Sequence, residues 1–142
     1  MKFERIVSKG ISSNSYFIAA DNEAAVIDPR RDVDIYLEFA QKYNVKITKI
    51  FDTHRNEDFV NGSPQLAYFT DAKIYHGHKL DFKYGEPVKE DDKFQIDELK
   101  FEILETPGHT PESISILLKA ESNPTKPFHD IHWRYSFCRG CR

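Results

Sequence analysis

The alternation of short apolar strands with helical segments is the feature that most constrains how this chain folds. Three apolar or alternating runs come first, with turn residues between them, at 3–7, 15–20 and 24–27. Apolar residues at helical spacing then predict a helix over 33–43, which Asp32 is placed to cap. The run 46–51 is rich in β-branched residues and predicts a buried strand. Strands and helices in this order predict an α/β layered domain rather than a helical bundle or an all-β barrel.

The rest of the apolar pattern belongs to the same domain. We expect a second helix over 63–69, a short strand at 74–75, a hairpin from 91–96 and 99–104, and an alternating strand over 113–118. The 142 residues are enough for one domain with a real core and too few for two of ordinary size. After Phe128 the pattern dissolves, so we take 1–128 as the domain and 129–142 as an aberrant tail.

The charge balance argues against some classes of partner. Charged residues make up 30% of the chain, but the net charge is only −3, which gives no electrostatic reason to expect a nucleic acid or an anionic membrane as partner. The N-terminal residues form no apolar signal segment, and no run approaches the length that spans a bilayer. Both cysteines, Cys138 and Cys141, lie at the C-terminal end, so no disulfide staples the domain. We therefore expect a cytoplasmic protein.

Two segments place a histidine in a tight loop directly after a strand. His54 lies in Thr-His-Arg-Asn-Glu-Asp-Phe (53–59), and His109 lies in Thr-Pro-Gly-His-Thr-Pro-Glu-Ser (106–113). In open α/β layers, ligands bind beyond the carboxyl ends of the strands, and a loop there fixes the imidazole while leaving it accessible. Either histidine alone is more typical of a surface residue, so the pair carries the argument for a metal site.

Together the two segments resemble the metallo-β-lactamase superfamily, whose signature is Thr-His-x-His-x-Asp-His followed further along by a Gly-His loop. The likeness runs to about Phe128 and includes Asn-Ser-Tyr at 14–16 and the strand end Ile-Asp-Pro at 27–29. The resemblance implies a four-layer αββα sandwich of two similar halves, of which this truncated chain supplies the N-terminal half. It also implies that His54 and His109 are metal ligands. A lone half leaves sheet surface without its usual cover, so self-association is expected.

This sequence departs from the signature at two positions that matter for the metal. Asn56 and Phe59 stand where the superfamily has its second and last histidines, and neither side chain replaces imidazole as a ligand of a second metal. The variant resembles persulfide dioxygenases fused to rhodanese domains, relatives of the glyoxalase II group, in which two histidines and one aspartate hold an iron. The resemblance implies one Fe(II), with zinc as the alternative, and gives Asp58 a supporting catalytic role. A cap on the following helix is an equally good interpretation of Asp58.

The resemblance leaves three functions open. The first is the oxidation of a low-molecular-weight thiol persulfide by O₂ to sulfite. The second is hydrolysis of a thioester by metal-bound hydroxide, as in glyoxalase II. The third is a non-catalytic remnant or a zinc module, because His129, His132, Cys138 and Cys141 have spacings that suit tetrahedral zinc. In the first two functions the partner is a small molecule.

Four further residues are weaker candidates. On resemblance alone, Tyr84 borders the substrate pocket. Arg30 either meets an anionic substrate group or lies in a solvated turn. His76 and His78 have the spacing to share a metal in an extended segment, but we favour a packing or pocket-lining role for them.

The tail suggests a shifted reading frame. The family motif Thr-Gly-Asp-Thr-Leu-Phe-Val-Gly-Asp, whose first Asp is the third ligand, is absent from the chain. Codons can, however, be chosen for 129–141 that encode this motif, preceded by Met-Ile-Phe, when they are read from the second base of each codon. The single Trp codon at Trp133 forces the motif's first Gly, since any Arg134 codon begins with C or A. The ligand Asp would span the codons of Arg134 and Tyr135. We therefore expect this chain to hold a metal weakly and to show little or no catalysis.

Overall fold

The computed structural model describes residues 2–8, 13–54, 62–80, 82–106 and 113–120. In this part, a mixed sheet has the strand order β1-β2-β3-β4-β5-β6, and a second, antiparallel sheet has the order β7-β8-β9. The strands of the first sheet are Lys2–Ser8 (β1), Ser13–Ala19 (β2), Glu23–Ile27 (β3), Lys46–Asp52 (β4), Lys73–Gly77 (β5) and Glu86–Val88 (β6). Those of the second are Lys93–Ile96 (β7), Leu99–Glu105 (β8) and Ile114–Ala120 (β9).

The pairing of the first sheet changes from antiparallel to parallel at β3. β1, β2 and β3 form a meander, whereas β3, β4, β5 and β6 all run in one direction. Helix α1 (Asp34–Tyr43) connects β3 to β4, and helix α2 (Ser63–Thr70) lies between β4 and β5. Parallel neighbours need such crossovers, and their carboxyl ends meet at one edge of the sheet. That edge carries the residues that follow Ile27, Asp52 and Gly77.

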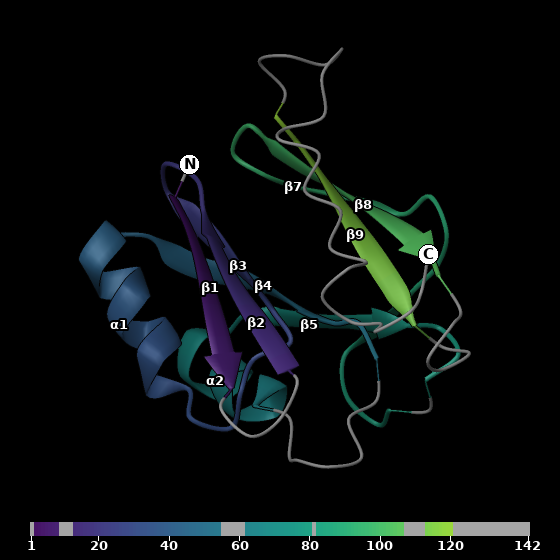
Figure 1. The fold of residues 1–142 in the computed structure, drawn as a ribbon, viewed down its shortest axis with the longest axis horizontal. Helices are drawn as coiled ribbons and strands as arrows, with labels where there is room; N and C mark the ends of the chain where they lie inside the picture. The colour runs from purple at the N-terminus through teal and green to yellow at the C-terminus, as the bar shows by residue number, and fades with distance from the viewer. Residues whose placement is uncertain (1, 9–12, 55–61, 81, 107–112, 121–142) are drawn as a thin grey trace.

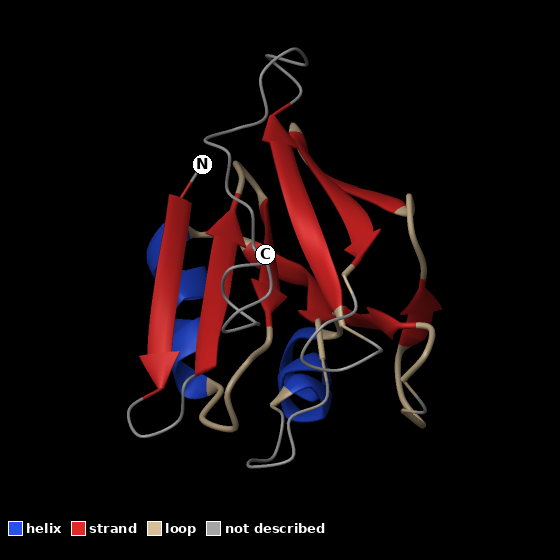
Figure 2. Cartoon of the chain, turned by 45° about the vertical axis from the view of Figure 1, so that its right-hand side comes forward, coloured by secondary structure: helices blue, strands red, loops and turns tan. Residues whose placement is uncertain are grey.

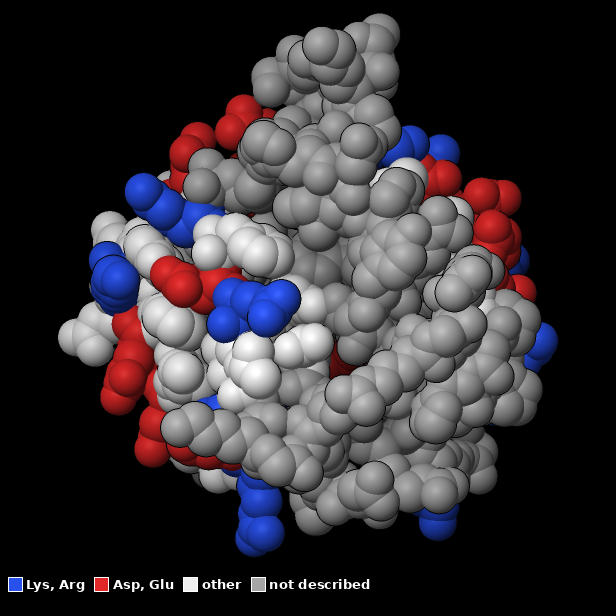
Figure 3. All heavy atoms as spheres, in the orientation of Figure 1, with Lys and Arg blue, Asp and Glu red and all other residues white. Residues whose placement is uncertain are grey.

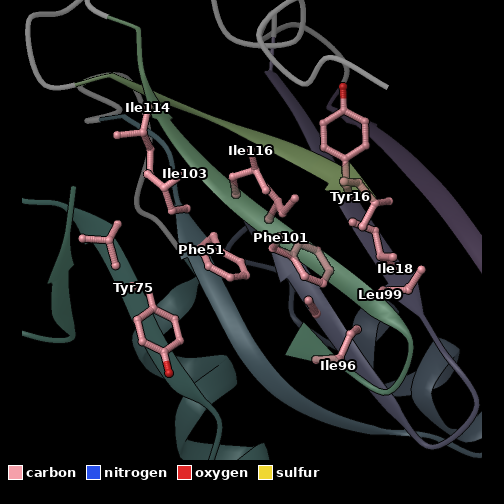
Figure 4. Close-up of a cluster of buried hydrophobic side chains, with 14 residues drawn as sticks. Tyr16, Ile18, Phe51, Tyr75, Ile96, Leu99, Phe101, Ile103, Ile114 and Ile116 are labelled. Carbon is pink, nitrogen blue, oxygen red and sulfur yellow. The ribbon is translucent and has the colours of Figure 1, made fainter. Parts of the chain in front are cut away.

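The two sheets pack face to face over an apolar core (Figure 4). Alternate residues of the first sheet, among them Ile18, Ile27 and Phe51, point toward Phe101 and Ile116 of the second. The Phe51 ring is stacked on the Phe101 ring, with centroids 5.7 Å apart. Side chains alternate between the two faces of a strand, so every second residue points into this core and the residues between them point to the opposite face.

The opposite face of the first sheet is covered by both helices (Figures 1 and 2). The intervening residues of the strands, such as Phe17, Val26 and Ile50, are buried there with Tyr36 of α1 and Leu66 of α2. The described residues therefore form three layers in the order helices, mixed sheet, antiparallel sheet. This order confirms the expected α/β class and agrees with the first half of an αββα sandwich.

Several expected boundaries were wrong for local reasons. α1 begins at Asp34 with Val33 at the N-cap and no side-chain cap, while the Asp32 carboxylate lies 3.8 Å from the Arg30 guanidinium instead. The first strand of the hairpin starts only at Lys93, because Asp91 has a positive φ of 70° in the preceding turn. The short strand β6 was not expected, since its three residues carry no periodic pattern.

The outer surface of the described residues mixes both signs of charge. Lys and Arg are interspersed with Asp and Glu on the face shown in Figure 3, where the described atoms are visible. No helix within the described ranges is long and apolar enough to cross a membrane.

Candidate metal centre

The carboxyl ends of β3 and β4 bring Asp28 and His54 together. Asp28 follows β3 in a left-handed conformation (φ 51°), and its backbone N–H donates to the Phe51 carbonyl at 2.8 Å. Thr53 and His54 follow β4 directly. Because β3 and β4 are parallel neighbours, both strand ends reach the same edge of the sheet.

The Asp28 carboxylate and the His54 imidazole are joined through Thr53. Asp28 Oδ1 accepts the Thr53 backbone N–H at 2.8 Å, and Asp28 Oδ2 accepts the Thr53 hydroxyl. Thr53 Oγ1 in turn lies 2.9 Å from His54 Nδ1, which is 3.9 Å from Asp28 Oδ2. Asp28 and Thr53 are buried, and the His54 side chain is 14% exposed. The buried pair therefore orients an imidazole that remains partly accessible.

Burial sets the electrostatics of this group. Loss of solvent raises the pKa of the Asp28 carboxyl above its ordinary value, and the neighbouring His54 and the two Thr53 hydrogen bonds oppose that shift. A carboxylate in such a place depends on its donors, because a buried charge without partners is strongly destabilising.

When Asp28 is ionised, the direction of these hydrogen bonds determines which His54 nitrogen carries a lone pair. An ionised Asp28 can only accept, so the single Thr53 hydroxyl proton is donated to it. The contact between Thr53 Oγ1 and His54 Nδ1 then requires a proton on Nδ1. In a neutral imidazole the lone pair is therefore on Nε2. A histidine that binds a metal through one nitrogen commonly donates a hydrogen bond from the other, and this arrangement leaves Nε2 available for the metal. His54 thus fits the role of a metal ligand.

The residues on either side of the 107–112 segment, which contains His109, are joined to each other, and β9 is joined to Thr53. Thr106 N donates to the Ser113 carbonyl at 3.0 Å, and the Thr106 and Ser115 hydroxyls are 2.8 Å apart. Ile114 N, at the start of β9, donates to the Thr53 carbonyl at 2.9 Å. The first residue of β9, which follows this segment, is therefore hydrogen-bonded to the residue that precedes His54.

A second buried carboxylate lies one residue before Thr53. Asp52 is fully buried; its Oδ1 accepts the Ser63 hydroxyl at 2.5 Å, and its Oδ2 accepts the Tyr84 hydroxyl at 3.3 Å. Burial, and then the Asp52 charge and hydrogen bond, raise the pKa of the Tyr84 hydroxyl, so Tyr84 stays a neutral donor. Asp52 thus connects the end of β4 to the start of α2 and to the turn before β6.

Neither Asp52 nor Ser63 was among the expected site residues. Sequence reasoning treated the strand before Thr53 as uniformly buried and overlooked its last residue. A carboxylate that directly precedes a Thr-His pair at a strand end was the available signal, because a buried charge there needs donors from neighbouring elements.

The two expected substrate contacts lie in different surroundings. Tyr84 is adjacent to the site through Asp52, and its ring is stacked on Phe82 with centroids 5.0 Å apart. The Arg30 side chain is 28% exposed and lies toward Asp32, as in a solvated turn. Its backbone N–H donates to the Tyr36 hydroxyl at 2.8 Å, and Tyr36 donates to Ser15 Oγ at 2.7 Å, which links the residues after β3 to β2. Substrate binding by Tyr84 and Arg30 remains a prediction.

Gly62 holds the start of α2 against the residues after β3. Its N–H donates to the Pro29 carbonyl at 3.0 Å, and a Cβ on Gly62 would lie 1.9 Å from the Arg30 carbonyl oxygen. No other residue fits this approach without moving the backbone.

His76 and His78 contact different partners. His76 is buried, with Nδ1 3.0 Å from the Gly77 carbonyl and its ring edge-on to Phe82. His78 Nε2 donates instead to the Glu105 carboxylate. Within the part of the chain that the structure describes, no three His, Cys, Asp or Glu side chains gather as a metal site.

The remaining candidate site residues, and the two positions that depart from the signature, lie outside the described residues. These are His109, Asp58 with its neighbours Asn56 and Phe59, and the tail residues His129, His132, Cys138 and Cys141. Their roles stay predictions.

Known proteins of similar sequence or structure include hydroxyacylglutathione hydrolases, a metallo-β-lactamase and ETHE1. It is 28% identical over 117 residues to the hydroxyacylglutathione hydrolase of Francisella tularensis subsp. novicida, covering 81% of this chain and 46% of that protein. A metallo-β-lactamase from Staphylococcus aureus superposes with a TM-score of 0.81 at 34% identity, over 90% of this chain and 41% of that one. ETHE1 from Myxococcus xanthus gives a TM-score of 0.78 at 30% identity, over 83% and 54%.

The chain spans about half the length of the curated relatives it matches. No family model matches it. The similarity therefore covers both histidine-bearing segments but only part of the relatives' fold.

Proposed function

We propose that this chain, which is similar in sequence and fold to members of the metallo-β-lactamase superfamily, is a non-haem Fe(II) persulfide dioxygenase. The overall change would convert a thiol persulfide, O₂ and water into the thiol, sulfite and two protons. The alternative in the same superfamily is a glyoxalase II-like thioester hydrolase.

The observation that carries the proposal is the ligand set of the His54 segment. Asn56 and Phe59 remove two imidazoles that a second metal would need, whereas the Asp28–Thr53–His54 chain prepares one imidazole as a ligand. Two histidines and one carboxylate leave coordination positions for substrate and O₂ on a single iron. A dinuclear hydrolase needs more nitrogen ligands than this segment offers.

The residues of this chain have separate tasks in that reaction. His54 and His109 would hold the iron, which, when bound, supplies a redox-active Lewis acid for the substrate sulfur and O₂. Thr53 and Asp28 keep the proton on His54 Nδ1 and hold the ring in place. Asp58 would orient a ligand or a water, and Tyr84 would border the persulfide. The partner is a small sulfur compound.

The hydrolase alternative rests on the relatives. The similar curated proteins from Francisella and from Marinomonas are named hydroxyacylglutathione hydrolases. For this chain that activity would require metal-bound hydroxide as nucleophile and a second metal ion beside the first. Metal content separates the two candidates.

We also propose that the third ligand is the aspartate encoded out of frame across Arg134 and Tyr135. On this proposal 129–142 is an aberrant tail rather than a zinc module, and the chain as it stands has little activity. A cytoplasmic location and self-association through uncovered sheet surface stay predictions.

The test is to sequence the gene past Phe128 and to express a version with the frame restored. We expect about one iron per chain, O₂ uptake with glutathione persulfide and release of sulfite, all lost in His54→Ala. Lys73→Ala, which changes an exposed pair far from Asp28, is the matched control. Two zinc ions per chain with thioester hydrolysis would favour the alternative. Stoichiometric zinc in the present chain, abolished by Cys138→Ser, would favour the zinc module.

A further inference from the structure

The end of the β8–β9 hairpin contacts the first sheet at two neighbouring points. Glu105, the last residue of β8, and Ile114, the first of β9, are paired in the antiparallel ladder. Ile114 N donates to the Thr53 carbonyl after β4, and the Glu105 carboxylate accepts His78 Nε2 after β5. β4 and β5 are themselves adjacent parallel strands. One paired position of the second sheet is thus attached to two adjacent strands of the first.

The two attachments restrain the hairpin end at different strands of the first sheet. The apolar core already holds the hairpin against the first sheet, and the Ile114 N–H ties its end to the Thr53 carbonyl. The Glu105 carboxylate adds a second polar attachment, to the residue after the neighbouring strand β5, which further restrains the orientation of the hairpin end. Thr106, the next residue, closes the base of the following segment by donating to Ser113.

His78 is a firm anchor for this contact. Its backbone N–H donates to the Val88 carbonyl at 2.9 Å, and the turn after it is closed by Leu80 N to the Gly77 carbonyl at 3.0 Å. Glu105 is held from the other side, because its backbone N–H donates to the Glu90 carboxylate. The His78 and Glu105 side chains are 44% and 31% exposed. Exposed pairs of this kind contribute little to folding, so stability alone does not explain the arrangement.

We propose that His78 and Glu105 are positioning residues that orient the β8–β9 hairpin end relative to His54. The inference rests on the proposed metal site, because the orientation matters only if ligands from both sheets share one ion. Partners that orient metal ligands change metal affinity by about 10-fold to 100-fold when removed, with the fold intact. The pair should therefore affect metal binding much more than unfolding.

The first measurement is amide hydrogen exchange, which tests the contact without any metal. In His78→Ala we expect the Thr106 N–H to exchange about 10-fold faster, because the hairpin end loses one of its two polar attachments, whereas the Ile114 N–H changes by less than about 2-fold. His78→Gln keeps an N–H donor near the Nε2 position and should restore slow exchange. Lys73→Ala, on the strand that leads to His78, is the control and should change neither amide.

The second measurement is Co(II) titration of the same variants of the full chain. We expect His78→Ala and Glu105→Gln each to weaken Co(II) binding by about 10-fold, with His78→Gln close to the parent and melting temperatures without metal nearly equal. If Thr106 exchange is unchanged in His78→Ala, the His78–Glu105 contact does not restrain the hairpin end, and the proposal is overturned. Faster exchange with unaltered Co(II) affinity overturns the positioning role. If His54→Ala leaves Co(II) binding intact, the metal site itself is what fails, and the positioning role fails with it.

Discussion

The segments that contain His54 and His109 are supported in different ways. Around His54, the supporting groups are buried carboxylates: Asp28 accepts both Thr53 donors, and Asp52 accepts Ser63. At the two ends of the segment that contains His109, the contacts are between neutral hydroxyl and backbone groups or across the partly exposed His78–Glu105 pair. Hydrogen bonds to buried charges are stronger and more directional than neutral or exposed ones. The residues around His54 are therefore held by buried charges, whereas the two ends of the segment that contains His109 are held by weaker contacts.

The largest effect that tests this difference is expected from Asp28→Asn. The new amide would donate to Thr53 Oγ1, so the Thr53 hydroxyl would turn to His54 Nδ1 and push the imidazole proton onto Nε2. We expect Co(II) affinity to fall by about 100-fold, the upper end for partners of metal ligands. Titration at neutral pH measures it, with far-UV circular dichroism to confirm folding. Retained affinity in a folded variant would contradict the assigned tautomer.

The same variant should also change how stability depends on pH. Burial raises the pKa of Asp28 in the folded chain above its ordinary value of 3.8. Its contribution to stability is therefore complete below pH 3.8 and is lost as pH rises through the higher folded value. Urea unfolding across this acidic range should show a smaller decline for Asp28→Asn than for the parent. An identical decline in both would exclude Asp28 as its source.

Next in size is Ser63→Ala, which removes a donor from the buried Asp52 carboxylate. We expect a loss of about 2 kcal/mol in the free energy of unfolding, because hydrogen bonds to buried charges are worth this much. Tyr84→Phe is the matched comparison on the same carboxylate, and its longer 3.3 Å contact should cost only about 0.5 kcal/mol. Urea denaturation without metal measures both. Equal losses would show that distance does not rank these donors.

Ser115→Ala tests the base of the His109 segment with the same kind of substitution. It removes a hydroxyl partner of Thr106 in a neutral contact, so we expect a loss of about 1 kcal/mol, half that of Ser63→Ala. The same urea experiment measures it. A loss as large as that of Ser63→Ala would remove the distinction between the two segments.

The smallest effect is expected at the opposite end of the sandwich. The Asp97 carboxylate accepts the backbone N–H groups of Asn22 at 2.8 Å and Glu23 at 3.2 Å, and these bonds, Asn22 first, lower its pKa although desolvation opposes them. Its contribution is present above pH 3.8 and is lost as pH falls through the lower folded value. Asp97→Asn should therefore slightly reduce the acid dependence of melting and leave Co(II) affinity unchanged. A change in Co(II) affinity would mean that the far contact also orients the site.

The sequence predicted the main elements because their patterns are local. The helices over 33–43 and 63–69 and the strand over 46–51 agree with α1, α2 and β4 to within one or two residues. β6 was missed, since a three-residue parallel strand is formed only by its neighbour β5. Asp32 was wrong as a cap, because the nearby Arg30 guanidinium attracts its carboxylate.

What the sequence determined by itself was the layered α/β class, the family resemblance and His54 as a ligand candidate at a strand end. Periodicity and short motifs are enough for these, because each is written within a few neighbouring residues. Only the tertiary structure decided the partners: Asp28 with Thr53, Asp52 with Ser63, and His78 with Glu105. Such pairs join residues up to 27 positions apart, and which donors meet a buried carboxylate depends on how strands and sheets pack.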